Sequence, residues 1–435
     1  APLIECAFIE TEDGTGPYGA KAGGEHSINP TIAAIGNAIG DATGVYLKTL
    51  PMTPQKVLTE LSRRSGKLPA TKPWKRPFNA EIATVRAMYP STVFPALKKL
   101  GSMVSHGRPR SDGFEYVAAD SLASAISLLQ VDSGRAMVLA GGTDLFVGVQ
   151  QGIYAPTRVV DITGIEALRS IDLSDEASRI GGAVTLSEIL AHTALCERHP
   201  SLREGIEGIA TQQIRNVATL AGDLSQEKRC WFFRSAFPCY KFGGASCPCY
   251  AVTGDSRHHS IHGARRCAAP CVADAAPILH SLDAKVLLTG PKGQRSVSLG
   301  AFYTWSGETV VQPGEIICEI VIPRPRIETT EVFEKYAQWQ GDFAEASVAV
   351  QLGWKGEQIA QARIAFGGVS PLPERATRVE RAIAQSAFSA EHVAEAAATA
   401  VHGALALKDN ESKIPLLVNL TARALERAVN EKDPG

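Results

Sequence analysis

The chain has no long apolar run, no repeat and no obvious export signal. No stretch of about 18 consecutive apolar residues occurs, which is the length that a membrane-spanning helix requires. The first five residues lack the basic start and apolar stretch of a secretory signal. We therefore expect a soluble protein of the cytoplasm, or of the periplasm if a partner chain carries the export signal, and no contact with a membrane.

An excess of one charge is also absent. The chain has 44 Lys and Arg residues against 45 Asp and Glu residues, and its formal net charge is -1. Bulk electrostatics thus gives no reason to expect a nucleic acid as a partner. With 435 residues the chain is long enough for two or three domains with cores of their own. These features favour chemistry on a small-molecule substrate.

The first part of the chain divides into a compact section and a linker. Residues 1–64 combine a glycine-rich loop with two predicted helices, and Thr53 and Pro54 have the residue types of an N-cap and a first helical position. Residues 61–80 contain six basic residues, three prolines and no acidic residue. This composition is typical of a linker, which we place at residues 65–110.

The rest of the chain is predicted to be α+β. Short strands and helices alternate through residues 111–324. Residues 325–435 form a further section with three predicted strands followed by Ala-rich helices. The strands are expected near residues 332–338, 346–353 and 360–367, and the helices near 375–407 and 412–431.

Two glycine turns are candidate cofactor-binding loops. Gly141 and Gly142 directly follow an apolar strand, so their backbone N–H groups can turn towards an anion and the absent Cβ atoms permit close approach. A glycine pair after a strand is often only a turn. The second stretch, residues 213–224, is more specific, and here the sequence resembles the FAD-binding domain of molybdenum hydroxylases, where two such loops hold the flavin's pyrophosphate.

The resemblance covers residues 114–430, including residues 182–185 and 363–369. It implies a two-subdomain FAD-binding domain of the xanthine dehydrogenase type, followed by a C-terminal domain with a three-stranded sheet and helices. By this likeness the cofactor is bound by Gly141, Gly142, Thr143, Asp144, Thr219, Gly222, Asp223, Asp274 and Lys335. The family usually has Asn where this chain has Asp223, and a carboxylate is electrostatically less comfortable beside a pyrophosphate.

Nine cysteines are present, and five of them lie between Cys230 and Cys267. An odd number in a chain without a signal peptide favours metal binding or buried thiols over a disulfide scaffold. Cys230, Cys239, Cys247 and Cys267 are separated by 8, 7 and 19 residues, and four thiolates on a glycine- and serine-rich loop suit a 4Fe-4S cluster. Zinc sites usually pair their thiolates closely. Zinc, unliganded thiols and one disulfide remain alternatives.

The cysteine segment, defined here as residues 225–270, resembles a branch of the same family with an inserted cluster loop. The likeness rests on residues 229–234, 238–241 and 257–261. Periplasmic aldehyde oxidoreductases belong to this branch, and 4-hydroxybenzoyl-CoA reductases have a related insertion. In it the fourth ligand precedes the flavin-contacting Asp by seven positions, as Cys267 precedes Asp274. The likeness implies Cys230, Cys239, Cys247 and Cys267 as ligands, with Cys249 and Cys271 as substitutes and His258 and His259 as local hydrogen-bonding residues.

A carboxylate in the N-terminal section is a candidate catalytic residue. Residues 16–25 form a glycine-dense loop that presents Glu25 beside the apolar residues 30–39. A lone Glu in a loop is usually just exposed. The stretch, however, resembles the C-terminal end of the molybdopterin-binding subunit of these enzymes, where the corresponding Glu is the general base. The fragment is too short to hold molybdopterin, so Glu25 would complete a site on another chain, unless the fragment is only a docking arm.

Together these patterns predict an oxidoreductase subunit. Electrons from a substrate oxidised at molybdenum on a large partner subunit would pass through 2Fe-2S clusters on a small partner subunit to FAD on this chain, and then to an external acceptor. An aldehyde is the favoured substrate, with an N-heterocycle or an aryl-CoA as alternatives. A reductive enzyme, with electrons flowing from the 4Fe-4S cluster through FAD to molybdenum, and a flavin-less assembly scaffold are the competing hypotheses.

Overall fold

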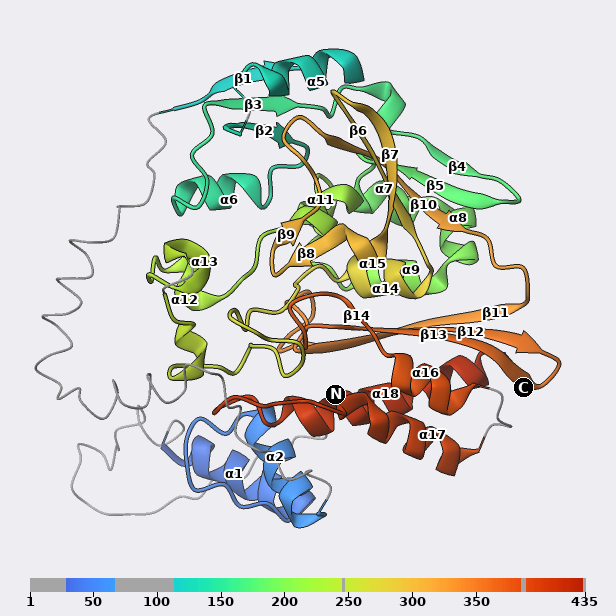
Figure 1. The fold of residues 1–435 in the computed structure, drawn as a ribbon. Helices are drawn as coiled ribbons and strands as arrows, with labels where there is room; N and C mark the ends of the chain where they lie inside the picture. The colour runs from blue at the N-terminus through green and yellow to red at the C-terminus, as the bar shows by residue number, and fades with distance from the viewer. Residues whose placement is uncertain (1–28, 67–112, 133, 245–246, 385–388, 433–435) are drawn as a thin grey trace, which may run out of the picture. The chain divides into compact units, whose positions relative to one another are not determined.

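A computed structural model describes residues 29–66, 113–132, 134–244, 247–384 and 389–432 (Figure 1). The chain divides into two compact units, residues 1–67 and 68–435. Glu25 lies outside the described residues. None of the described helices has the length and apolar character that crossing a membrane requires.

The first unit contains two helices, α1 (Asn29–Thr43) and α2 (Pro54–Arg64). Thr53 caps α2, because its side chain accepts a hydrogen bond from the Lys56 N–H, and Pro54 occupies the first helical position, where no N–H is needed. Both predictions for this helix are confirmed.

The second unit begins with a small parallel sheet of strand order β1-β3-β2. Its strands are β1 (Glu115–Ala118), β2 (Ala136–Leu139) and β3 (Arg158–Asp161). Helix α5 (Leu122–Gln130), capped by Ser121, and helix α6 (Leu145–Gln150) connect them. Parallel strands require such crossovers, and the loop that follows β2 carries the first glycine turn.

A five-stranded antiparallel sheet of order β4-β5-β10-β6-β7 follows. Its strands are β4 (Ile171–Leu173), β5 (Ala177–Gly181), β6 (Lys285–Gly290), β7 (Gly293–Ser298) and β10 (Ile316–Pro323). The short hairpin β8 (Tyr303–Trp305) and β9 (Glu308–Thr309) lies beside it. The associated helices are η2 (Glu166–Leu168), α7 (Leu186–Ala191), α8 (Thr193–Arg198), α9 (Pro200–Glu207), α10 (Gln212–Arg215), α11 (Leu220–Ser225), α14 (Ala275–Ser281) and α15 (Leu299–Phe302).

The C-terminal sheet has the order β11-β12-β13-β14. The three long strands β11 (Thr329–Tyr336), β12 (Ala346–Lys355) and β13 (Gln358–Gly367) lie where the sequence places them. A fourth strand, β14 (Glu374–Arg375), was not predicted, because two residues are too few to show an alternating pattern. The predicted three-stranded sheet is thus extended at one edge.

Helices cover both faces of this sheet. Helix α18 (Lys413–Asn430) packs on β11 and β12, next to α16 (Thr377–Ile383), α17 (Ala390–Ala398) and η4 (Thr399–Val401), and α9 and α14 contact the opposite face (Figure 1). Residues 346–354 of β12 are consequently all buried. The C-terminal sheet therefore shares part of its core with the preceding domain, to which α9 and α14 belong.

The cysteine segment connects α11 to α14 with little regular structure. It contains only α12 (Trp231–Arg234), α13 (Tyr240–Gly243) and η3 (Tyr250–Val252) among its described residues. Its residues Phe232, Ala251 and Ala268 form a small apolar cluster with Leu407 of the C-terminal domain. Ile261 of the segment belongs to the core of the C-terminal domain.

Candidate flavin and iron-sulfur sites

The first glycine turn contacts the second loop through its backbone. A Cβ on Gly141 would overlap the carbonyl oxygen of Val217, and one on Gly142 would meet the Phe146 ring. Gly142 also has a φ of 69°, in the left-handed region that favours glycine. The glycines therefore allow two loops that are far apart in the sequence to touch, in addition to leaving backbone N–H groups accessible.

The second loop is shaped by threonine caps. The Thr211 side chain caps α10, and the Thr219 side chain accepts a 3.0 Å hydrogen bond from the Gly222 N–H at the start of α11. Thr219 also forms an isolated bridge with Thr185, the residue that caps α7 in a capping box. These local bonds fix the loop against the start of α7.

Both loops line one cavity of about 870 Å³. Seven predicted cofactor residues belong to its wall: Gly141, Thr143, Asp144, Thr219, Gly222, Asp223 and Asp274. Gly142 and Lys335 do not; Gly142 shapes the turn and Lys335 contacts Asp274 from behind the wall. The volume lies within the range of about 300–1,000 Å³ that is usual for sites of organic ligands, so the residues present fit a dinucleotide cofactor.

A buried ion pair supports one wall of the cavity. Lys335 Nζ lies 2.5 Å from the Asp274 carboxylate and donates a second hydrogen bond of 2.9 Å to the Gly208 carbonyl. Burial raises the pKa of Asp274 to about 6, although the Lys335 charge opposes this shift. The pair holds β11 against α14 at the edge of the cavity.

Asp223 joins two helices at the same wall. One of its carboxylate oxygens accepts a 3.1 Å hydrogen bond from the Ala275 N–H, and the other accepts a 2.8 Å bond from the Gln226 amide. Burial, followed by the nearby charge of Asp274, raises the pKa of Asp223 to about 7. Because both oxygens have donors on the protein, Asp223 holds the wall together, whereas an Asn has one acceptor oxygen and can accept only one of these two bonds at it.

Asp144 connects the first turn to the cysteine segment. Its carboxylate lies 2.8 Å from an Arg229 nitrogen and 3.2 Å from an Arg234 nitrogen, and it accepts a 2.8 Å hydrogen bond from the Glu227 N–H. All three partners lie within a few residues of Cys230. Asp144 therefore holds the first residues of the cysteine segment beside the cavity.

Aromatic residues on the hairpin between β11 and β12 complete the wall, and sequence reasoning missed them. Trp339 and Phe343 line the cavity, and the Arg229 guanidinium lies 5.0 Å from the centre of the Phe343 ring. Gly341, with a φ of 91°, accepts a hydrogen bond from the Ala210 N–H and ties the hairpin to the second loop. The glycine indicates a turn in the sequence, but nothing there distinguishes these aromatics from ordinary sheet residues.

The predicted cluster ligands lie in one region but at different depths. Cys239 and Cys267 are buried, and Cys230 and Cys247 are half-buried. Burial raises the pKa of Cys230 to about 12, and the neighbouring Cys267 and Cys249 act in the same direction. Burial likewise raises the pKa of Cys239, again with Cys267 nearby. Cys267 is thus close enough to interact with both of these thiols.

The described residues contain no ligand set for a single metal ion. Within the described parts of the chain, no three His, Cys, Asp or Glu side chains are grouped closely enough to hold a metal ion. The Cys230 sulfur lies 3.3 Å from a His259 ring nitrogen, and His258 is hydrogen-bonded to Glu345, so the local bonding role predicted for both histidines is confirmed. The 4Fe-4S cluster stays a prediction.

Comparison with known proteins places this geometry in a family. Residues 112–325 match the FAD binding domain in molybdopterin dehydrogenase, and residues 331–431 match the CO dehydrogenase flavoprotein C-terminal domain. The chain belongs to the FAD-binding medium subunits of the molybdenum hydroxylase family. The predicted family and fold class are thereby confirmed, as is the assignment to oxidoreductase subunits.

Individual members of the family align over nearly their whole length. The aldehyde oxidoreductase FAD-binding subunit PaoB of Escherichia coli strain K12 is 32% identical over 300 residues, which are 66% of this chain and 91% of that protein. The carbon monoxide dehydrogenase medium chain of Hydrogenophaga pseudoflava is 25% identical over 73% of this chain and 96% of its own. A solved structure of carbon monoxide dehydrogenase from that organism, lacking the Mo-pyranopterin moiety, gives a TM-score of 0.60 at 26% identity and covers 74% of this chain and 98% of the compared one.

The first matched family region begins at residue 112 and the second at residue 331, so neither includes the N-terminal section. The boundaries predicted at residues 64, 110 and 324, and the role predicted for Glu25, therefore remain predictions.

Proposed function

We propose that FAD binds in the cavity between the two glycine turns and that this chain passes electrons from a substrate oxidised on a partner subunit to an external acceptor. The observation that carries the proposal is the backbone contact between the Gly141 turn and the Val217 loop, which encloses a cavity of about 870 Å³. Membership of the family supports the same cofactor. Bound FAD would supply the capacity to take up and release electrons.

The chain's own residues would bind and orient this cofactor. Residues of both turns line the cavity, and the Lys335–Asp274 pair keeps one wall in place. Asp223 has a pKa raised to about 7 by burial and by Asp274, so it can hold a proton at neutral pH. A neutral Asp223 would remove the electrostatic objection to a carboxylate near a pyrophosphate.

The proposed partners are a molybdopterin-binding large subunit and a 2Fe-2S small subunit. Support comes from the relatives, which are named as medium chains or FAD-binding subunits of larger enzymes. The 32% identity to a subunit of an aldehyde oxidoreductase favours an aldehyde as the substrate oxidised on the large subunit. The test is to purify the full chain with its partners, determine bound flavin, and screen aldehydes with an artificial acceptor; a complex without flavin would contradict the proposal.

We also propose that Cys230, Cys239, Cys247 and Cys267 hold a 4Fe-4S cluster. The electrostatic influence of Cys267 on both Cys230 and Cys239 supports the set. Iron analysis and electron paramagnetic resonance of the reduced chain would test it. If the cluster's midpoint potential lay well below that of the flavin, the reductive direction of electron flow would be favoured instead.

Glu25 is proposed as the general base of the molybdenum site on the large subunit, on the basis of its sequence context alone. In the assembled complex, Glu25→Gln should abolish most turnover and leave the FAD content unchanged, since the acid would act on the partner's substrate. Normal turnover by this variant would show that Glu25 is not the general base and that the N-terminal section serves only to dock the partner.

A further inference from the structure

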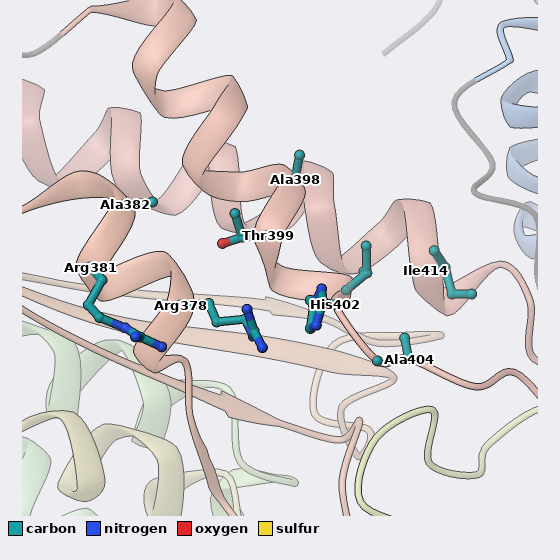
Figure 2. A pocket seen from close by; sticks show the side chains of 10 residues that line it. Arg378, Arg381, Ala382, Ala398, Thr399, His402, Ala404 and Ile414 are labelled. Carbon is teal, nitrogen blue, oxygen red and sulfur yellow. The ribbon is translucent and has the colours of Figure 1, made fainter.

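A second cavity lies in the helical layer of the C-terminal domain. It has a volume of about 790 Å³ and is bordered by α16, the end of α17, η4 and the start of α18 (Figure 2). Its wall is formed by Arg378, Arg381, Ala382, Ala398, Thr399, Val401, His402, Gly403, Ala404 and Ile414. None of these residues lines the flavin cavity, so this cavity is a separate feature.

Basic groups converge on this cavity. Arg378 and Arg381 are three residues apart on α16, a spacing that places side chains on one face of a helix. In Figure 2 the Arg378 side chain lies between those of Arg381 and His402, and His402 comes from the turn after η4. Two guanidinium groups and an imidazole from different elements therefore face the same space.

The positive charge of the cavity is not neutralised by the wall. The wall contains no Asp or Glu, and neither arginine forms an ion pair with a carboxylate of the described residues. Some exposed arginines elsewhere are paired with a carboxylate, as Arg203 is with Glu207 and Arg324 with Asp175. Unpaired guanidinium groups in a concave site are the usual arrangement for binding an anion.

The acid on the same helix is engaged elsewhere. The Glu380 carboxylate lies 2.7 Å from the Arg375 guanidinium and accepts a 2.7 Å hydrogen bond from the Ile364 N–H. On the cavity side, Arg381 Nε donates a 3.1 Å hydrogen bond to the Thr377 carbonyl, which restrains its side chain along α16. On α16, Glu380 is therefore bonded to Ile364 and Arg375, whereas Arg378 and Arg381 line the cavity.

The remaining wall is apolar. Ala382, Ala398, Val401, Ala404 and Ile414 surround the basic groups, and Thr399 adds a hydroxyl. Apolar walls with a few convergent polar groups are typical of sites for organic molecules, and the volume lies within their usual range of about 300–1,000 Å³.

We propose that this cavity binds a small phosphate-bearing molecule, with Arg378 and Arg381 contacting the phosphate and the apolar wall contacting the rest of the ligand. Guanidinium groups match phosphate oxygens in geometry and can donate two parallel hydrogen bonds to them. The inference does not depend on the proposed flavin function, because it concerns a different cavity.

Calorimetric titration of the full chain, loaded with FAD so that the flavin cavity is occupied, would test the proposal with inorganic pyrophosphate and AMP as probes. We expect binding of one of the probes, and a loss of at least about tenfold in affinity in the double variant R378Q/R381Q, because both charged donors are removed. Both arginines are exposed, so the variant should fold. Arg203→Gln, at another exposed arginine, should bind like the wild type.

The proposal is overturned if neither probe binds, or if the double variant binds as well as the wild type. It is also overturned if the double variant instead weakens assembly with the partner subunits while neither probe binds, since the cavity would then be part of a protein interface. Should the chain not retain FAD, the same titration on the FAD-free chain with the same double variant still separates this cavity from the flavin cavity.

Discussion

The flavin cavity and the cysteine segment are adjacent but are built in different ways. The cavity wall rests on backbone contact between two loops and on the Lys335–Asp274 pair. In the cysteine segment, burial raises the pKa of Cys230 to about 12 and also raises the pKa of Cys239. Neutral thiols are therefore favoured there, and bringing four thiolates together needs the compensating charge of bound iron.

The difference teaches that backbone contact shapes the candidate cofactor cavity, whereas the proposed iron ligands lie on a segment with little regular structure. Asp144 joins the two regions through Arg229 and Arg234. The following substitutions test the cavity and the cysteine segment one at a time. They are ordered from the largest expected effect to the smallest.

Gly141→Ala should have the largest effect. The added Cβ would overlap the Val217 carbonyl, so the two loops must separate. We expect loss of FAD together with a decrease of about 3 kcal/mol or more in the free energy of unfolding. Absorbance of the purified chain and urea denaturation would measure both quantities.

Gly164→Ala is the matched control, because a Cβ there has no neighbour within 4 Å. It should retain FAD and unfold within about 1 kcal/mol of the wild type. If Gly141→Ala retained FAD as well as this control does, the backbone contact would not be what forms the cavity.

Cys239→Ala tests whether the cysteine segment can lose its iron independently of the flavin. We expect loss of the iron of the 4Fe-4S cluster while FAD is retained, because the cavity wall does not depend on this thiol. Iron and flavin per chain are the measurements. Cys196→Ala, at a buried cysteine of α8 outside the segment, should keep both; equal iron in the two variants would refute the proposed ligand.

Lys335→Met tests the ion pair of the cavity wall. Removing the ammonium leaves the buried Asp274 carboxylate without its partner, so the free energy of unfolding at pH 7 should fall by about 3 kcal/mol. The loss should be smaller at pH 5, because Asp274, with a pKa already raised to about 6, then takes up a proton. Denaturation at both pH values measures this, and an equal loss at both would contradict it.

Asp223→Asn should have the smallest effect, confined to pH dependence. The pKa of Asp223 is raised from 3.8 to about 7, so the folded state holds a proton that the unfolded state has released. Its contribution to stability is complete below pH 3.8 and is lost as the pH rises to about 7.

The Asn side chain can still accept from the Ala275 N–H and cannot titrate, so unfolding free energies measured from pH 4 to 7 should vary less than in the wild type. Asp175→Asn, at a fully exposed side chain, should leave the wild-type slope unchanged. A slope in Asp223→Asn equal to that of the wild type would show that this acid does not titrate in the expected range.

Local features of the fold could be predicted from the sequence, but contacts between distant segments could not. The cap at Thr53 and the three long strands of the C-terminal sheet follow from residue type and alternation. The two-residue strand β14 exists only because β13 offers it a partner.

The candidate site shows the same limit. Its glycines were recognisable from their motifs, but the contact of Gly141 with Val217 and the pairing of Asp144 with Arg229 depend on how the chain folds. Trp339 and Phe343 have no sequence signal that would place them at the cavity.

The most direct test of the central claim is the amount of FAD bound by the full chain purified with its partner subunits, compared with the same complex carrying Gly141→Ala. The account predicts one FAD per chain in the wild type and none in the variant. A wild-type complex without FAD, or a variant with a full complement of it, would contradict the account.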